Sequence, residues 1–221
     1  MKLLAIDTST SLASVALSMD GVVFVEEKPS LNDHATCLLP MIALVLKSAG
    51  CELRDLDGLV FGEGPGSFTG LRIACSVAKG LAYVHALPLF AVSGLDAIAC
   101  QVRDKLSPDM DRLVMLDARM NQVYWAHVTH ETRHALPCVS DASSVLFSCD
   151  RPLYLVGVGF EPYVKALPHV VQDALVTQQV VYPHATGLIQ YVEEQRPTAR
   201  LVDEAQPLYV RNQVALGASC G

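Results

Sequence analysis

Residues 59–86, with the sequence LVFGEGPGSFTGLRIACSVAKGLAYVHA, are typical of a strand, a glycine-rich loop and a long helix in succession. The apolar run 59–61 predicts a strand, and we expect the helix to extend from Phe68 to about Ala86 with Ser67 as its N-cap. Loops of this kind can bind phosphate through backbone N–H groups, but this one has neither the lysine of a P-loop nor the G-x-G-x-x-G pattern. The segment therefore indicates an α/β unit and supports a nucleotide site only weakly.

Short strands and helices surround this unit in the first half of the chain. In chain order we expect a strand at 3–6 that ends at Asp7, hairpin strands at 13–19 and 22–26, a helix at 33–49, a strand at 89–92 and a helix at 93–105. The Asp20-Gly21 pair between two apolar runs is a strong signal for a hairpin turn. Gly50 is placed to end the first helix in a left-handed conformation.

The second half of the chain repeats this order. After a boundary at about 106–111, we expect a strand at 112–117 that ends at Asp117, a turn at 118–121, strands at 122–129 and 153–158, and a helix at 184–195. The pattern predicts two related α/β lobes of the actin-like or ribonuclease H-like type, with mixed sheets flanked by helices. We expect the lobes at 1–105 and 106–221, the second being smaller and its last segment packing back on the first.

The composition is that of a globular protein. The chain has 221 residues, of which 51% are hydrophobic and 18% charged, and its formal net charge is −7. An acidic chain without a basic run is a poor general binder of nucleic acid, because phosphate contacts need clustered lysine and arginine. A partner would therefore have to supply most of the positive surface in any such complex. No segment is typical of a membrane span or of a secretory signal, so we expect a cytoplasmic protein.

Metal-binding patterns give little support for an enzyme. None of the seven cysteines lies in a C-x-x-C pair, which argues against a four-thiolate zinc site. Residues 130–134, HETRH, fit the H-E-x-x-H signature of zinc proteases, which requires a helix. Here the motif continues a β pattern, and residues i and i+4 of a strand lie about 13 Å apart. Metalloprotease activity is therefore the weakest alternative, and no G-x-S-x-G motif indicates a serine hydrolase.

Two helices in the first half carry more apolar surface than one sheet face requires. One stripe of the helix at 33–49 comprises Cys37, Leu38, Met41, Ile42, Val45, Leu46 and Ala49. Leu39, Ala43 and Leu44 are also apolar but lie off this stripe, so a second surface must bury them. One side of the helix at 68–86 is formed by Leu71, Cys75, Ala78 and Ala82. Small side chains let another helix approach closely. Both helices are either buried deep inside the fold or part of an interface with two helices of another subunit.

Five stretches spread over nearly the whole chain resemble the TsaB (YeaZ) family. They are LLAIDTST at 3–10, ATCLLPMI at 35–42, GPGSFTGLRIACSVAKGLA at 64–82, LDARMNQVYWA at 116–126 and PLYVRNQVA at 207–215. The third is the most specific, because it matches the family block GPGSFTGLR-x-G-x-x-x-AKGLA almost completely. Ala74 and Asn121 each replace a glycine of the family pattern, and asparagine tolerates the left-handed turn that glycine would form.

This resemblance implies a two-lobed actin-like fold and a non-catalytic subunit of the complex that forms N6-threonylcarbamoyladenosine in tRNA. That complex transfers a threonylcarbamoyl group from its adenylate to the adenosine next to the anticodon of tRNAs that read ANN codons. The chain would bind and stabilise the larger catalytic homologue TsaD, and the small ATPase TsaE would join them. Transfer RNA would bind through the complex, and ATP and metal would belong to the partners rather than to this chain alone. Without TsaD, the chain would form homodimers through the same helices.

The resemblance also implies the positions of the partner interface. These are His34, Leu38, Met41, Ile42 and Val45 on the first helix, and Gly64, Pro65, Gly66, Phe68, Leu71, Arg72, Cys75, Ala78 and Ala82 in the loop and second helix. The catalytic homologue binds metal through two histidines on the corresponding helix, whereas this helix carries His34 alone. We therefore expect no metal site here and a surface or capping position for His34.

The two aspartates that end strands lie where actin-like ATPases hold Mg²⁺ and phosphate. The candidate residues are Asp7, Thr8, Ser9, Asp117 and Arg119. The turn at 8–12 has no glycine that would admit phosphates, so we interpret these residues as relics of a nucleotide site. If they are active instead, the chain would be an ATP-dependent phosphotransferase of the sugar-kinase type, which is the main alternative function.

Overall fold

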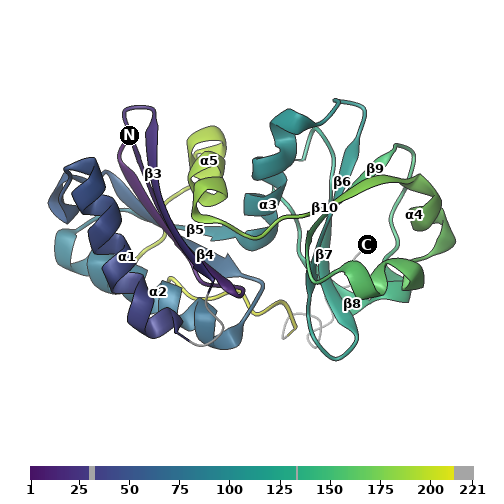
Figure 1. Cartoon of the computed structure of the whole chain (residues 1–221), viewed down its shortest axis with the longest axis horizontal. Coiled ribbons are helices and arrows are strands. Elements are labelled where there is room, and N and C mark those ends of the chain that lie inside the picture. The colour runs from purple at the N-terminus through teal and green to yellow at the C-terminus, as the bar shows by residue number, and fades with distance from the viewer. Residues whose placement is uncertain (30–32, 133, 212–221) are drawn as a thin grey trace.

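The computed structural model describes residues 1–29, 33–132 and 134–211, which form two α/β lobes side by side (Figure 1). The strands are β1 (Leu3–Asp7), β2 (Leu12–Met19), β3 (Val22–Pro29), β4 (Gly58–Gly64), β5 (Leu89–Ser93), β6 (Asp111–Asp117), β7 (Gln122–Val128), β8 (Cys138–Asp141), β9 (Leu153–Val158) and β10 (Leu175–Val180). The α-helices are α1 (His34–Ala49), α2 (Phe68–His85), α3 (Gly94–Val102), α4 (His169–Ala174) and α5 (Ala185–Gln195). Short 3₁₀ helices include η1 (Leu53–Asp55), η2 (Arg103–Lys105), η3 (Ala142–Ser144) and η4 (Glu161–Ala166).

The N-lobe is built on a five-stranded mixed sheet with the order β3-β2-β1-β4-β5. The first three strands are antiparallel, whereas β4 and β5 run parallel to β1. Asp20 and Gly21 connect β2 to β3 with φ angles of 53° and 82°, as a two-residue hairpin turn of type I′ requires. The predicted hairpin is therefore confirmed. Strands β1 and β4 are buried along their whole length, which explains their apolar sequences.

The C-lobe repeats this topology with the strand order β8-β7-β6-β9-β10. Strands β6, β7 and β8 are antiparallel, and β9 and β10 run parallel to β6. The shared strand order confirms the predicted pair of related lobes. Strands β8 and β10 and helix α4 were not predicted, because two of them are very short and β10 is largely exposed without a regular apolar alternation.

Helices cover both faces of the N-lobe sheet, and one of them is shared with the C-lobe. Helices α1 and α2 lie next to each other on one face, where their inner residues form a core with β1, β2 and β4 (Figure 1). Helix α5 covers the opposite face together with α3. Helix α3 lies between the two sheets, since Ala97 packs towards the N-lobe core and Leu95 and Ile98 pack towards the C-lobe core. It ends at Val102, earlier than predicted, and continues as η2.

The segment after α5 crosses the N-lobe and reaches the C-lobe. The Arg200 N–H donates to the carbonyl of Leu89, and the Leu208 N–H donates to the carbonyl of Glu63. Arg211 then binds the carbonyl of Ala118, in the turn after β6, at 2.9 Å. This segment therefore ties α2 and β4 to the first hairpin of the C-lobe. Within the described part of the chain, no helix combines the length and the apolar character needed to cross a lipid bilayer.

Candidate functional site

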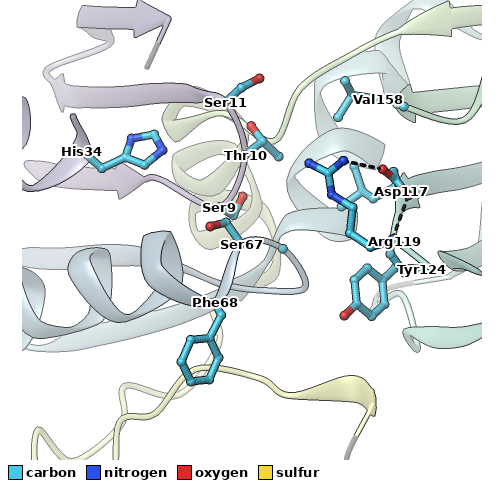
Figure 2. Close-up of a pocket in the computed structure, with 14 residues that line it drawn as sticks. Ser9, Thr10, Ser11, His34, Ser67, Phe68, Asp117, Arg119, Tyr124 and Val158 are labelled. Atoms are coloured by element: carbon cyan, nitrogen blue, oxygen red, sulfur yellow. Dashed lines mark hydrogen bonds and ion pairs between the residues drawn. The ribbon is translucent and has the colours of Figure 1, made fainter. Parts of the chain in front are cut away.

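A cleft of about 410 Å³ opens between the lobes at the carboxyl ends of β1, β6 and β9. The N-lobe lines it with the β1–β2 turn at 9–11, with His34 and with the first residues of α2 (Figure 2). The C-lobe lines it with the end of β6 and the following turn, together with Tyr124, Val158 and Gly159. Open α/β sheets place ligand sites at this end of their strands, so the cleft is where the predicted relic residues would act.

Asp7 lies beneath the cleft and takes no part in its lining. Its Oδ1 accepts hydrogen bonds from the backbone N–H of Ser9 at 2.9 Å and from the Ser9 hydroxyl at 2.7 Å. Its Oδ2 lies against Gly62, where any side chain would clash, and finds no hydrogen-bond partner among the described residues. Burial raises the pKa of Asp7 to about 6. Thr8 is also buried and donates to the carbonyl of Gly70 at 2.7 Å. Both residues therefore stabilise the β1–β2 turn.

Asp117 and Arg119 do line the cleft, but their side chains bind each other and Tyr163 within the C-lobe. Asp117 Oδ1 accepts hydrogen bonds from the Arg119 N–H at 2.8 Å and from the Tyr163 hydroxyl at 3.0 Å. The Arg119 guanidinium lies 3.4 Å from Asp117 Oδ2, and its side chain is 87% exposed. Arg119 and Asn121 both have positive φ angles, which confirms that position 121 adopts a left-handed turn. Of the five relic candidates, the cleft thus brings together Ser9, Asp117 and Arg119.

His34 is buried in the cleft wall, so the expectation of a surface or capping position was wrong. It begins α1, the helix that packs against the hairpin strands β2 and β3. Burial lowers the pKa of His34, which favours the neutral imidazole. Among the described residues, no group of three or more histidine, cysteine, aspartate or glutamate side chains is arranged to hold a metal ion.

The described residues of the H-E-x-x-H motif, 130–132 and 134, lie outside regular secondary structure and not in the strand that the sequence predicted. Strand β7 ends at Val128, and the Thr129 N–H binds the hydroxyl of Thr132 at 2.9 Å. Both histidines are exposed, but His134 is bound to Asp96 in helix α3. The two histidines of the motif thus have different surroundings, and the arrangement lacks the helix that a zinc protease needs.

Most residues assigned to a partner interface belong to the core of the chain itself. The side chains of Leu38, Met41, Ile42, Val45, Cys75, Ala78 and Ala82 pack with β1 and β4. Leu71 is also buried. Gly64 and Pro65 are buried as well, whereas Gly66 borders the cleft and Phe68 and Arg72 are exposed. The assignment of the buried side chains to the interface is therefore corrected, because the regular stripe of each helix faces its own sheet.

A second, apolar side of α1 and α2 is largely uncovered. We define the outer apolar face as Leu39, Pro40, Ala43 and Leu44 of α1 and Ile73, Val77, Gly80 and Val84 of α2. Ile73 and Val77 are half-buried against the N-lobe core, whereas the other six residues are exposed. Leu39 is 55% exposed, Leu44 49% and Val84 74%. Helical spacing places the four α2 positions on one side of that helix. Exposed apolar groups gathered on neighbouring helices are typical of a protein interaction surface.

The sequence did not indicate a polar cluster that joins the lobes around Asp96. Asp96 is buried in α3, where its Oδ2 binds His134 Nδ1 at 2.6 Å and its Oδ1 accepts the Ala135 N–H at 2.6 Å. The hydroxyl of Tyr191 in α5 lies 3.4 Å from the same histidine nitrogen. Burial raises the pKa of nearby Glu63, and Arg200 pairs with that carboxylate at 3.0 Å. These contacts hold the C-lobe loop against helices of the N-lobe.

The His134–Asp96 pair is expected to make stability depend on pH. The hydrogen bond to Asp96 raises the pKa of His134 above its ordinary value of 6.5. The folded chain therefore favours the protonated ring, and this stabilisation is complete below about pH 6.5 and is lost as pH rises through the raised pKa. Urea unfolding should show that His134→Gln destabilises the chain more at pH 6 than at pH 8.5. His130→Gln, at the histidine of the same motif that does not pair with Asp96, is the control and should show no such difference. Equal losses at both pH values for His134→Gln would contradict the assignment.

Comparisons with known proteins agree with this architecture. A family model described as TsaD, tRNA N6-adenosine threonylcarbamoyltransferase, matches residues 19–153. The Escherichia coli K12 protein named tRNA threonylcarbamoyladenosine biosynthesis protein TsaB is 33% identical, over 97% of this chain and 96% of its own length. The solved structure of YeaZ from Pseudomonas aeruginosa is 31% identical, covers 94% of this chain and 99% of its own, and superposes with a TM-score of 0.82.

A more distant structure shows the fold alone. The N-acetylglucosamine kinase described from Porphyromonas gingivalis is 9% identical and superposes with a TM-score of 0.50 over 88% of this chain. Three findings support one assignment. The two lobes share one strand order, a cleft lies between them, and two known proteins match over nearly the full chain. The chain has an actin-like two-lobed fold and belongs to the TsaB (YeaZ) family, within the group that the TsaD family model describes.

Proposed function

We propose that this chain is a non-catalytic subunit of the complex that forms N6-threonylcarbamoyladenosine next to the anticodon of tRNAs that read ANN codons. It would act by binding and stabilising a TsaD-like catalytic homologue. The names of its relatives support the pathway. The outer apolar face of α1 and α2 supports the binding role, because exposed leucine and valine side chains favour contact with another protein over contact with water.

The chemistry of the outer apolar face suits a pair of partner helices. Its α2 side combines the branched residues Ile73, Val77 and Val84 with Gly80, around which there is open space. A small residue between larger ones lets another helix pack closely. A catalytic homologue with the same fold would present two corresponding helices, so the interface would be a bundle of four helices with an apolar centre.

The geometry of the cleft supports an accessory role rather than an independent enzyme. The Asp7 carboxyl lies beneath the cleft and is enclosed by Gly62 and Ser9, so it could not reach a bound nucleotide without opening the β1–β2 turn. We therefore assign ATP and metal to the partner proteins, and we expect the TsaE-like ATPase and tRNA to join through the complex in the cytoplasm. A chain without its partner would form homodimers through the outer apolar face.

Mixing the purified chain with its TsaD-like partner tests the proposal. Size-exclusion chromatography with light scattering should show a one-to-one complex. Addition of the partner should dissociate any homodimer, because the homodimer and the complex use the same outer apolar face. Adding the small ATPase, ATP, threonylcarbamoyl adenylate and tRNA should then reconstitute the modification only when this chain is present. Separate elution of the two proteins at tens of micromolar, with modification independent of this chain, would refute the proposal.

Calorimetry separates the proposal from the phosphotransferase alternative. A sugar-kinase-type enzyme should bind ATP and Mg²⁺ by itself, because its active site would lie within one chain. We expect no heat of ATP binding from the isolated chain at concentrations that suffice for a micromolar affinity. A stoichiometric ATP site that is lost in an Asp117→Asn variant would favour the alternative.

A further inference from the structure

Three segments that are distant in the sequence bring arginines and aromatic rings together beside the cleft, whose lining includes Phe68 and Arg119. We define the cationic strip as Arg72, Arg119 and Arg211 with the rings of Phe68 and Tyr209. The Arg72 guanidinium lies 3.8 Å from the centroid of the Phe68 ring, and its Nε donates to the Tyr209 hydroxyl at 3.0 Å. The two rings lie 5.6 Å apart. This group connects the first turn of α2 to the segment after α5.

Arg211 extends the cationic strip across to the C-lobe. Its Nη2 donates to the Ala118 carbonyl at 2.9 Å and to Gln122 Oε1 at 3.2 Å, on either side of the turn that carries Arg119. Figure 2 shows Arg119 on the C-lobe wall of the cleft opposite Ser9 and Thr10, with Phe68 on the N-lobe side. Contacts thus connect Arg72, through Tyr209 and the segment that contains it, to Arg211 and the turn that carries Arg119.

The arginines of the cationic strip are available to an anionic partner. Within the described ranges, Arg72 and Arg211 have no carboxylate at ion-pairing distance, and Arg119 has only Asp117 at 3.4 Å. All three side chains are exposed. Such a cluster is unexpected in a chain with a net charge of −7, in which acidic groups outnumber basic ones. Guanidinium groups bind phosphates through two parallel hydrogen bonds, and exposed aromatic rings can stack on unpaired bases.

We propose that the cationic strip is the part of this chain that contacts tRNA, with its arginines on backbone phosphates and the exposed Phe68 ring available to an unpaired base. The inference rests on the proposed function, which supplies tRNA as the nucleic acid in the complex. A protein partner fits less well, because the contact proposed for the TsaD-like partner uses the outer apolar face, whereas the cationic strip carries exposed charged groups. Three phosphate contacts are few, so the catalytic partner must supply most of the electrostatic attraction.

The test uses the complex of this chain with its TsaD-like partner and measures tRNA binding by fluorescence anisotropy at several salt concentrations. Arg119→Gln and Arg211→Gln should each weaken binding at least about threefold at low salt and lower the salt slope by about one, since each removes one phosphate contact. Arg151→Gln changes an exposed arginine just before β9, at the opposite end of that strand from the cleft, and should leave binding unchanged. Thermal melts of the isolated variants verify that they fold.

The possible results separate this inference from the proposed function. If the complex forms and both variants bind tRNA as the unaltered complex does, the cationic strip is not a tRNA contact and the inference fails while the proposed function stands. If either variant no longer binds the TsaD-like partner, the cationic strip is a protein interface and the inference fails as well. If the unaltered chain does not bind that partner at all, the proposed function itself has failed.

Discussion

A double variant with Leu39→Asp and Leu44→Asp is expected to abolish binding to the TsaD-like partner while the chain itself stays folded. Both side chains are about half exposed in the isolated chain, so the new carboxylates would remain hydrated there. In the complex they would be enclosed by the partner, and burying an unpaired charge costs several kcal/mol. We expect the dissociation constant to rise at least about 100-fold, which corresponds to about 2.7 kcal/mol.

The measurement is a calorimetric or biosensor titration of the partner, combined with urea unfolding of the variant alone. Leu146→Asp is the matched control, because Leu146 is also an exposed leucine but lies in the C-lobe, away from α1 and α2. It should leave the affinity within about twofold. Tight binding by the double variant would show that the outer apolar face is not the interface, even if the two proteins do associate.

The sequence predicts the inner and outer sides of α1 but not which of them meets a partner. A 3.6-residue period identifies the stripe that contains Leu38 and Val45, and the presence of Leu39, Ala43 and Leu44 beside it indicates surplus apolar surface. The period does not say which stripe the sheet covers. In the structure the regular stripe faces β1 and β4, and the residues that lie off it remain outside. The interface therefore stays a prediction, with Leu39 and Leu44 in place of Leu38 and Val45 as its contact residues.

Polar clusters that depend on long-range contacts could not be predicted in the same way. The Asp96–His134 pair joins residues 38 positions apart, and no local pattern relates a buried helix to a turn in the other lobe. The cationic strip likewise needs α2, the turn after β6 and the segment after α5 in one place. Asp7 was predictable only in part. Its position at the end of β1 follows from the sequence, but its burial beneath the cleft depends on the close approach of Gly62.

Truncation of Leu38 should lower the stability of the chain and leave partner binding intact. The charged substitution at its neighbour Leu39 should do the reverse. Leu38 is 0% exposed and packs in the N-lobe core beneath α1. Leu38→Ala removes buried methyl groups and leaves a cavity, so the free energy of unfolding should fall by about 2–5 kcal/mol. That is a large part of the total for a domain, which is typically about 5–15 kcal/mol. Urea unfolding measures the loss directly, and Leu39→Ala is the control, with an expected change below about 0.5 kcal/mol.

Partner binding by these two alanine variants distinguishes core residues from interface residues. Under conditions in which both are folded, Leu38→Ala should retain its affinity for the TsaD-like partner within about threefold, because the outer surface is unchanged. Leu39→Ala should weaken binding despite its normal stability, since it removes apolar contact area from the outer apolar face. If Leu38→Ala were as stable as the unaltered chain but lost the partner, the side chain would have to reach the surface, and α1 would have to rotate on its sheet to expose it.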